Sequence, residues 1–333
     1  MGALRVTVTG ATGLIGPQLT AALLERGAEV TVLSRDPDRA RARLGDVTAI
    51  AWDPLADSAP VEALSGRDAV VHLAGAPVAQ RWSAKAKRAI RESRVIGTRN
   101  LLAGLAACAD ADGGEASSGG ANSGDADGDA ANGGGRPRML ISSSAIGYYG
   151  PRGDEPLDED APPGEDFLAR VCVEWEAEAA KARGLGLRVV QVRTGVVLDA
   201  AGGALAKMLT PFRLGVGGPV AGGRQYMSWI HADDLVGMVL AAIEDERWSG
   251  PINATAPEPV TNAAFSHALG KALHRPSLLP VPGLALRALY GEMAEIVTTG
   301  ARAVPAKPLV LGYEFSQPRL EQALRSALGS ASR

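Results

Sequence analysis

The sequence predicts an α/β fold built on a Rossmann-type, doubly wound parallel sheet. Residues 4–9 form a short β-rich run, residues 15–25 repeat apolar residues at helical spacing, and residues 29–33 form a second apolar run. These three segments have the order of a βαβ unit. Strands with few polar residues that are joined by crossover helices are typical of a parallel sheet covered on both faces.

The alternation of strands and helices continues along the chain. Four more strands are predicted, at residues 49–52, 69–73, 139–143 and 187–193, with a long helix at 83–107. After Pro257 the pattern changes to proline-punctuated helices at 284–295 and 318–328. We therefore predict a cofactor-binding Rossmann domain at 1–256 and a smaller, mostly helical C-terminal lobe at 257–333. Residues 199–229 are expected to contribute to the substrate lobe.

Residues 109–136 interrupt this pattern. The segment is almost entirely Gly, Ala, Ser, Asp and Asn, and it offers little apolar surface to offset the entropy of ordering it. We interpret it as a disordered loop inserted between a helix and the next strand. A docking segment is the functional alternative, but the low complexity and the lack of aromatic residues favour the loop.

Composition and charge exclude several classes of protein. With 46% hydrophobic and 21% charged residues, the chain is not disordered, collagen-like or a coiled coil over most of its length. The net charge of -3 and the pI near 5.9 give no general attraction to polyanions, so neither nucleic acid nor a membrane is expected as a partner. Cys108 and Cys172 are too few for a disulfide framework, which fits a reducing cytoplasm.

No metal site is predicted. His231 stands before Asp233 and Asp234 and could suggest acid-base or metal chemistry. A single histidine before an acidic pair at the start of a helix is more simply an N-terminal cap, and a metal site would need more ligands.

The strongest chemical signal is a glycine-rich loop between the first strand and the first helix. Gly10 permits a tight turn, Gly13 lets the backbone approach a pyrophosphate, and Gly16 allows close packing of helix and strand. The N-terminus of the helix supplies free N–H groups for the phosphates. Glycines also serve ordinary turns, but the strand-loop-helix setting indicates a dinucleotide site.

The residues after the second strand distinguish the two nicotinamide cofactors. A ribose 2′-hydroxyl is usually bound there by Asp or Glu, whereas this chain has Ser34 and Arg35, which suit a 2′-phosphate. NADP is therefore predicted over NAD, although Arg35 could also be a solvated surface residue. Asp53, after the third strand, could face the adenine or could form a turn with an Asx hydrogen bond.

Further motifs resemble those of the extended short-chain dehydrogenase/reductases. These are His72-Leu73-Ala74-Gly75, Val95-Ile96-Gly97-Thr98, Ser142-Ser143-Ser144 and Trp229-Ile230-His231-Ala232-Asp233-Asp234. More narrowly, the chain resembles the "epimerase family protein" branch, also described as cell-division-inhibitor-like. The signs of that branch are Ser34-Arg35, Trp52-Asp53, Arg81-Trp82, Ser93-Arg94, Tyr148-Tyr149-Gly150, Arg193-Thr194-Gly195-Val196-Val197-Leu198 and Pro211-Phe212-Arg213-Leu214-Gly215. The resemblance covers nearly the whole chain except the low-complexity insert.

This resemblance implies which residues surround the cofactor. They come from the glycine loop, the ends of the second and fourth strands and two later segments: Gly10, Thr12, Gly13, Leu14, Ile15, Gly16, Ser34, Arg35, Leu73, Ala74, Gly75, Arg94 and Val197. Many relatives also pair subunits through helices that flank the fourth and fifth strands, which makes a homodimer an expectation.

One departure from the wider family concerns the catalytic residues. Members generally use a Tyr-x-x-x-Lys pair to move a substrate proton, and Phe167 and Val171 stand at the corresponding positions here. Ser144 fits the place of a hydroxyl that holds a substrate oxygen, or it could satisfy backbone groups at the strand end. Tyr148 and Tyr149 could supply a replacement phenol, or they could be packing residues.

Two hypotheses about function follow. The first is an NADP(H)-dependent oxidoreductase or epimerase acting on a small carbonyl or hydroxyl compound, possibly a nucleotide sugar. The second is a non-catalytic NADP(H)-binding sensor or regulatory protein, which the missing Tyr-Lys pair favours. The complete cofactor loop and the hydroxyl groups near Ser144 favour the enzyme.

Overall fold

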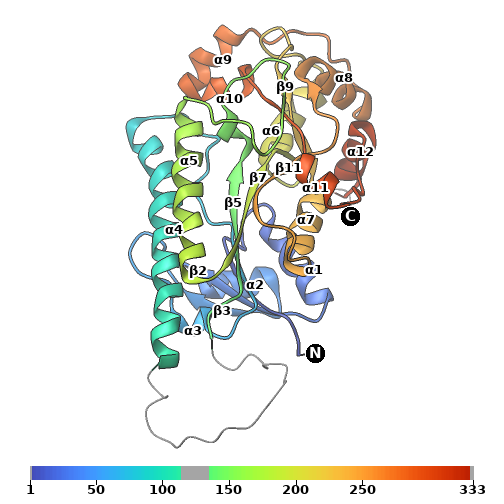
Figure 1. The fold of residues 1–333 in the computed structure, drawn as a ribbon. Helices are drawn as coiled ribbons and strands as arrows, with labels where there is room; N and C mark the ends of the chain where they lie inside the picture. Colours follow the sequence, from blue (N-terminus) through green and yellow to red (C-terminus); the bar gives the residue numbers. More distant parts are fainter. Residues whose placement is uncertain (1, 114–134, 331–333) are drawn as a thin grey trace, which may run out of the picture.

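The fold is organised around a seven-stranded parallel sheet, seen edge-on in Figure 1 within the computed structural model, which describes residues 2–113 and 135–330. The strand order is β11-β7-β5-β4-β1-β2-β3, and every neighbouring pair is parallel. The strands are β1 (Arg5–Thr9), β2 (Glu29–Ser34), β3 (Thr48–Ala51), β4 (Ala69–His72), β5 (Met139–Ala145), β7 (Arg188–Thr194) and β11 (Gly250–Ala254). The predicted doubly wound sheet is confirmed.

Helices cover both faces of this sheet. One face is covered by α1 (Gly16–Glu25), α2 (Pro37–Leu44) and α7 (Ala232–Glu244), and the other by α3 (Val61–Leu64), α4 (Ala84–Gly113) and α5 (Phe167–Ala180), followed by the 3-10 turn η2 (Lys181–Leu185). Alternating strand residues supply the two cores. Val71 and Ile141 pack toward α1 and α7, whereas Val70 and Leu140 pack toward α4. This period of two is what buries a strand on both faces.

A smaller lobe lies beyond the carboxyl ends of the strands (Figure 1). Its helices are α6 (Gly203–Arg213), α8 (Asn262–Ala272), α9 (Gly283–Tyr290), α10 (Glu295–Thr298) and α12 (Leu320–Ser330), whereas α11 (Ala306–Val310) lies against β11. Short strands join them: β6 (Pro156–Leu157), β8 (Val196–Leu198), β9 (Tyr226–Met227), β10 (Trp229–His231), β12 (Val260–Thr261) and β13 (Arg302–Ala303). Leu205, Leu209 and Phe212 of α6 pack with Phe265 of α8 and Leu324 of α12. Residues 199–229 therefore share a core with the lobe.

Two predicted boundaries were wrong. Helix α4 continues to Gly113, five residues into the segment predicted as a loop, and residues 114–134 of that segment lie outside the described residues. The helix predicted at 284–295 is divided, because Gly291 has φ +63° and ends α9 at Tyr290. A positive φ there favours glycine and stops a helix. The 3-10 turn η3 (Gly291–Ala294) and α10 follow.

Within residues 2–113 and 135–330, no helix is both long and apolar enough to cross a membrane.

A buried histidine joins three elements next to the glycine loop. His72, at the end of β4, lies 2.7 Å from Thr9 Oγ1 through Nδ1 and 3.2 Å from Thr98 Oγ1 through Nε2. Thr98 donates its only hydroxyl proton to Arg94 O, so His72 Nε2 must be the donor to Thr98 and Nδ1 the acceptor from Thr9. This neutral tautomer fixes β1, β4 and α4 relative to one another.

Protonation of His72 should therefore weaken the fold. Burial lowers the pKa of His72 to about 4 from its usual 6.5, so the unfolded chain binds a proton that the folded chain does not. The contribution of His72 is fully present above pH 6.5 and is lost as the pH falls toward 4. Between pH 7 and pH 4 the loss should be about 3 kcal/mol.

Urea denaturation gives the free energy of unfolding of the wild type and of His72→Gln at both pH values. The loss is the amount by which this free energy falls further in the wild type than in the variant. Other titrating groups are common to both proteins and cancel. Equal pH dependence in the two proteins would contradict the assignment of a neutral, buried His72.

Candidate functional site

The glycine loop between β1 and α1 forms a cradle at the carboxyl edge of the sheet. Gly10 has φ +69°, and a Cβ on it would lie 2.7 Å from Ala74 N, just beyond β4. A Cβ on Gly16 would lie 2.2 Å from Ala11 O, so a side chain there would push the loop away from α1. Ile15 precedes α1 without a side-chain cap, which leaves N–H groups free for a pyrophosphate. The loop fits a dinucleotide.

The end of β2 presents a free guanidinium. Arg35 is exposed, and no group within the described residues binds its side chain. The neighbouring carboxylate is already engaged, because Asp36 Oδ1 caps α2 by accepting from Arg39 N at 3.0 Å. Ser34 Oγ accepts from Asp36 N at 3.2 Å and so stabilises the turn. A free cation beside a helix-bound carboxylate suits a ribose 2′-phosphate better than a 2′-hydroxyl.

Two residues of α4 hold the segment that follows β4. Ser93 Oγ accepts from Ala76 N at 2.9 Å, and Arg94 Nη1 donates to Ala76 O at 3.1 Å. The guanidinium of Arg94 stacks on Trp175, 5.0 Å from the ring centroid. A Cβ on Gly75 would lie 3.3 Å from this guanidinium. Arg94 therefore borders the cradle at Gly75, where it could contact the cofactor.

Leu14 is covered by a segment of the smaller lobe. Positions for a Cβ on Gly202 and on Gly203 lie 2.7 and 2.8 Å from the methyl carbons of Leu14. Gln18 Nε2 donates to Asp199 Oδ2 at 2.8 Å and holds the same segment against α1. The close backbone approach explains why two glycines stand after Ala201.

The other predicted cofactor residues take different places. Ile15, Leu73 and Val197 are partly buried against one core, the core beneath α1 and α7. Asp53 Oδ1 accepts from Leu55 N at 3.0 Å, so the structure shows the Asx turn that was one of its two interpretations. Thr12 and Gly13 lie in the loop itself, where Gly13 N donates to Gly10 O at 2.9 Å.

Ser144 is held by a buried ion pair at the end of β5. Its Oγ lies 2.6 Å from Glu176 Oε1. Glu176 also binds Arg193 through both oxygens, each at 2.9 Å, and all three side chains are buried. A carboxylate has no proton to give, so the single hydroxyl proton of Ser144 points to Glu176. Ser144 therefore offers only lone pairs to a molecule bound beside it.

Leu168 and Cys172 of helix α5 face the end of β5, where Phe167 and Val171 were predicted. A Cβ on Gly147 would lie 3.5 Å from Leu168, and Cys172 lies beside Ser144 and the Ala145 amide. The face that meets the site thus carries Leu168 and Cys172, each one residue after the predicted Phe167 and Val171. Phe167 packs instead on Trp82 with ring centroids 5.2 Å apart. Neither register supplies a tyrosine or a lysine.

Cys172 cannot replace the missing lysine. Burial raises the pKa of its thiol to about 12, and the nearby Glu176 acts in the same direction. The thiol is therefore neutral at pH 7. Arg94 is the cation next to it.

The two tyrosines have different surroundings. Tyr149 is fully buried, and its hydroxyl lies 2.8 Å from Asp158 O, 2.7 Å from Asn253 Oδ1 and 3.0 Å from Arg193 Nη1. Burial raises the pKa of Tyr149 to about 12. This phenol has no room for a substrate, and the expectation of a catalytic Tyr149 is not supported because its hydroxyl is already bound by the protein.

Tyr148 remains accessible. It is partly exposed in the 3-10 turn η1 (Ile146–Tyr149), and its hydroxyl has no partner within the described part of the chain. The guanidinium carbon of Arg193 lies 3.5 Å from the centroid of its ring, which fixes the ring plane by a cation–π contact.

Glu176 and Arg193 had no predicted role. The signal for Glu176 was its spacing of four residues from Cys172, which places both on one face of a helix.

Two other features lie outside this site. His231 Nδ1 accepts from Asp233 N at 3.2 Å, so the predicted helix cap is confirmed. Across residues 2–113 and 135–330, no cluster of three or more His, Cys, Asp or Glu residues has the arrangement of a metal site.

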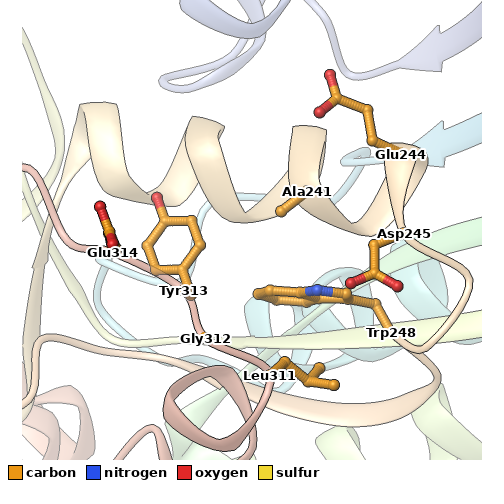
Figure 2. Close-up of a pocket in the computed structure, with 8 residues that line it drawn as sticks. All are labelled: Ala241, Glu244, Asp245, Trp248, Leu311, Gly312, Tyr313 and Glu314. Atoms are coloured by element: carbon orange, nitrogen blue, oxygen red, sulfur yellow. The ribbon is translucent and has the colours of Figure 1, made fainter.

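A surface hollow of about 310 Å³ lies at the opposite edge of the sheet, where α7 ends. Figure 2 shows the residues that line it: Ala241, Glu244, Asp245, Trp248, Leu311, Gly312, Tyr313 and Glu314. The Tyr313 hydroxyl points to α7 and donates to Asp234 O at 3.0 Å. Glu244 and Asp245 are paired with Arg26 and Arg247. The hollow is remote from the glycine loop, because α7 and β11 place it at the amino ends of the strands.

Comparisons with known proteins agree with this geometry. The model of the NAD dependent epimerase/dehydratase family matches residues 6–254, and a domain of unknown function, DUF1731, matches residues 281–327. The chain is 40% identical to an epimerase family protein of Mycobacterium bovis, Mb2239, over 96% of each chain. It is 36% identical to the mouse epimerase family protein SDR39U1, over 98% of this chain and 100% of that protein.

Solved structures show the same relationship. The human epimerase family protein SDR39U1, crystallised with NADPH, superimposes with a TM-score of 0.80 at 33% identity, covering 98% of this chain and 99% of that chain. A nucleoside-diphosphate sugar epimerase from Corynebacterium glutamicum gives a TM-score of 0.73 at 34% identity, covering 99% of this chain and 59% of that chain. The sequence matches, the fold and the glycine cradle together establish that the chain belongs to the NAD dependent epimerase/dehydratase family.

Proposed function

We propose that the protein is an NADP(H)-dependent oxidoreductase or epimerase that acts on a small carbonyl or hydroxyl compound, with a nucleotide-linked sugar as the first candidate. The observation that carries the proposal is the polar group at the end of β5, where Ser144 is held by Glu176 beside the cradle. The NADPH in the human relative and the free guanidinium of Arg35 support NADP(H). The activity named for the Corynebacterium glutamicum relative supports the sugar.

Binding of the cofactor is assigned to the cradle residues. The glycine loop from Gly10 to Gly16 would bind the pyrophosphate, and Arg35 the 2′-phosphate. Leu73, Ala74 and Gly75 would line the cofactor, with Arg94 beside the last of them. When bound, the nicotinamide supplies hydride transfer.

The residues near Ser144 would manage one proton. Because Ser144 accepts but does not donate, it would hold a substrate group that carries a proton, such as a hydroxyl. Tyr148 has a free phenolic O–H that can donate to a carbonyl oxygen. A neutral phenol can donate without prior ionisation, which favours carbonyl reduction over alcohol oxidation.

A second candidate is a non-catalytic NADP(H)-binding sensor. The specific observation in its favour is that Leu168 and Cys172 face the site where a tyrosine and a lysine would transfer a proton. Such a protein would bind the cofactor and turn over no substrate. For either candidate we also propose a reducing cytoplasm as the compartment, which the low cysteine content supports, and a homodimer as the assembly.

Arg35→Ala should reduce cofactor discrimination. Loss of a charge-assisted contact to the 2′-phosphate should weaken NADPH binding by about 1.5 to 3 kcal/mol and leave NADH binding nearly unchanged. Fluorescence titration with both cofactors measures the two losses. Arg43→Ala, an exposed arginine at the far end of α2, is the matched control. Equal losses for both cofactors would refute the assignment of Arg35.

Turnover should depend on Ser144 and Tyr148. NADPH oxidation is measured against aldehydes, ketones and nucleotide sugars, and Tyr148→Phe should lower kcat about 10²-fold or more on any substrate that reacts. Ser144→Ala should lower kcat/KM on the same substrate. Activity that survives both changes would place the chemistry elsewhere. Tight NADPH binding without turnover on any substrate would favour the sensor.

Tyr149→Phe should act on stability instead. Removing this hydroxyl takes away the donor that Asn253 Oδ1 binds and one of the two acceptors of Arg193 Nη1, the other being Glu159 O. The free energy of unfolding should fall by about 1 to 3 kcal/mol, which urea denaturation measures. A drop in kcat at unchanged stability would instead show that Tyr149 reaches the substrate.

A further inference from the structure

One lobe carries most of the large apolar side chains that are exposed. Of twelve such residues on the described chain, eight lie in two nearby stretches of the lobe: Leu214, Val216, Leu278, Leu279, Leu284, Leu289, Tyr290 and Ile296. We call these eight residues the apolar face. Leu278, Leu284 and Leu214 are 82%, 80% and 73% exposed. A concentration of this kind on a water-soluble fold indicates an interaction surface.

The two stretches are held side by side by their backbones. Arg275 Nε donates to Arg213 O at 3.1 Å, and Ala221 N donates to Val281 O at 3.0 Å. Val281 N in turn donates to Pro219 O at 2.8 Å. Helix α9 starts two residues later and has no buried residue along its length. The two stretches that carry the apolar face therefore lie side by side.

This surface is basic, although the chain is acidic overall. Residues 203–225 and 263–290 contain no Asp or Glu, and their Lys and Arg residues are Lys207, Arg213, Arg224, Lys271, Arg275 and Arg287. Within the described residues none of these six forms an ion pair. The stretch that leads to Ile296 contains two carboxylates, Glu292, which is paired with Lys87, and Glu295, which lies near Arg287.

We propose that the apolar face docks on an anionic lipid surface. Leucines that project from loops and from a short amphipathic helix can enter the boundary between headgroups and acyl chains, while Lys and Arg residues around them meet lipid phosphates. Such a protein lies on the membrane and does not span it. Two copies of this chain joined through the same face would bring unpaired cations together, which disfavours self-association. The expectation of no membrane partner rested on the charge of the whole chain, which averages over this surface.

Co-sedimentation with vesicles tests the proposal and needs no catalytic activity. The full chain should bind vesicles of equal parts phosphatidylcholine and phosphatidylglycerol about tenfold or more tightly than pure phosphatidylcholine vesicles. Binding should weaken several-fold when salt is raised from about 0.1 M to about 0.5 M, because the charges are screened. Thermal unfolding and NADPH titration monitor folding.

The double variant Leu278→Ser with Leu284→Ser should lose about tenfold or more of the binding to the anionic vesicles. Both leucines are exposed, so its thermal midpoint should equal that of the wild type. Val310→Ser is the matched control, since Val310 is 85% exposed on α11 and lies outside the apolar face. Its binding should equal that of the wild type.

Three outcomes would overturn the proposal. The first is no binding to the anionic vesicles, or equal binding to both kinds of vesicle. The second is a double variant that binds as tightly as the wild type. The third is a dimeric wild type that the double variant converts to a monomer, which would assign the apolar face to a second copy of the chain.

Discussion

The close approach of Gly10 to the backbone after β4 is the constraint on which the cofactor cradle depends. A Cβ at this position would meet Ala74 N at 2.7 Å, and the φ of +69° favours glycine independently. His72 holds β1, β4 and α4 together next to this contact, because its ring bonds both Thr9 and Thr98. Because Thr98 donates to Arg94 O, hydrogen bonds through His72 connect Thr9, next to the glycine loop, to the turn of α4 that carries Arg94.

A buried ion pair then decides which chemistry the strand end can perform. Glu176 accepts the hydrogen bond from Ser144, and Arg193 holds Glu176 while also donating to the Tyr149 hydroxyl and lying over the Tyr148 ring. Arg193 thus helps to hold the Tyr149 hydroxyl in the core and orients the ring of Tyr148. Removing one partner of a buried ion pair leaves an uncompensated charge. Substitution of Glu176 or Arg193 alone should therefore destabilise the fold. The loss of a Tyr-Lys pair is therefore accompanied by a different, fully connected polar network.

The fold and the cradle were predictable because their signals are local. Continuous apolar runs identify buried strands such as β4 and β5, and the glycine spacing between a strand and a helix identifies a dinucleotide-binding loop. The role of Ser144 was not predictable, since it depends on Glu176 and Arg193, which are distant in sequence and meet it only through packing of α5 on β5. For the same reason Tyr148 and Tyr149 could not be told apart. The helix register of Leu168 and Cys172 was misassigned because pattern alone does not fix which face meets the sheet.

The apolar face could not be predicted from the sequence either, because it combines residues that are distant along the chain. Net charge sums over the chain, whereas the Val220–Val281 bridge brings two acid-free stretches together in space. The lobe that carries this face also touches the segment after Gly75: Arg81 Nη1 donates to Leu289 O at 3.5 Å, Lys207 Nζ donates to Ala79 O at 2.8 Å, and Lys87 pairs with Glu292. The helix that carries Leu284 and Leu289 therefore contacts the segment whose first residues, at Ala76, are held by Ser93 and Arg94 beside the cradle.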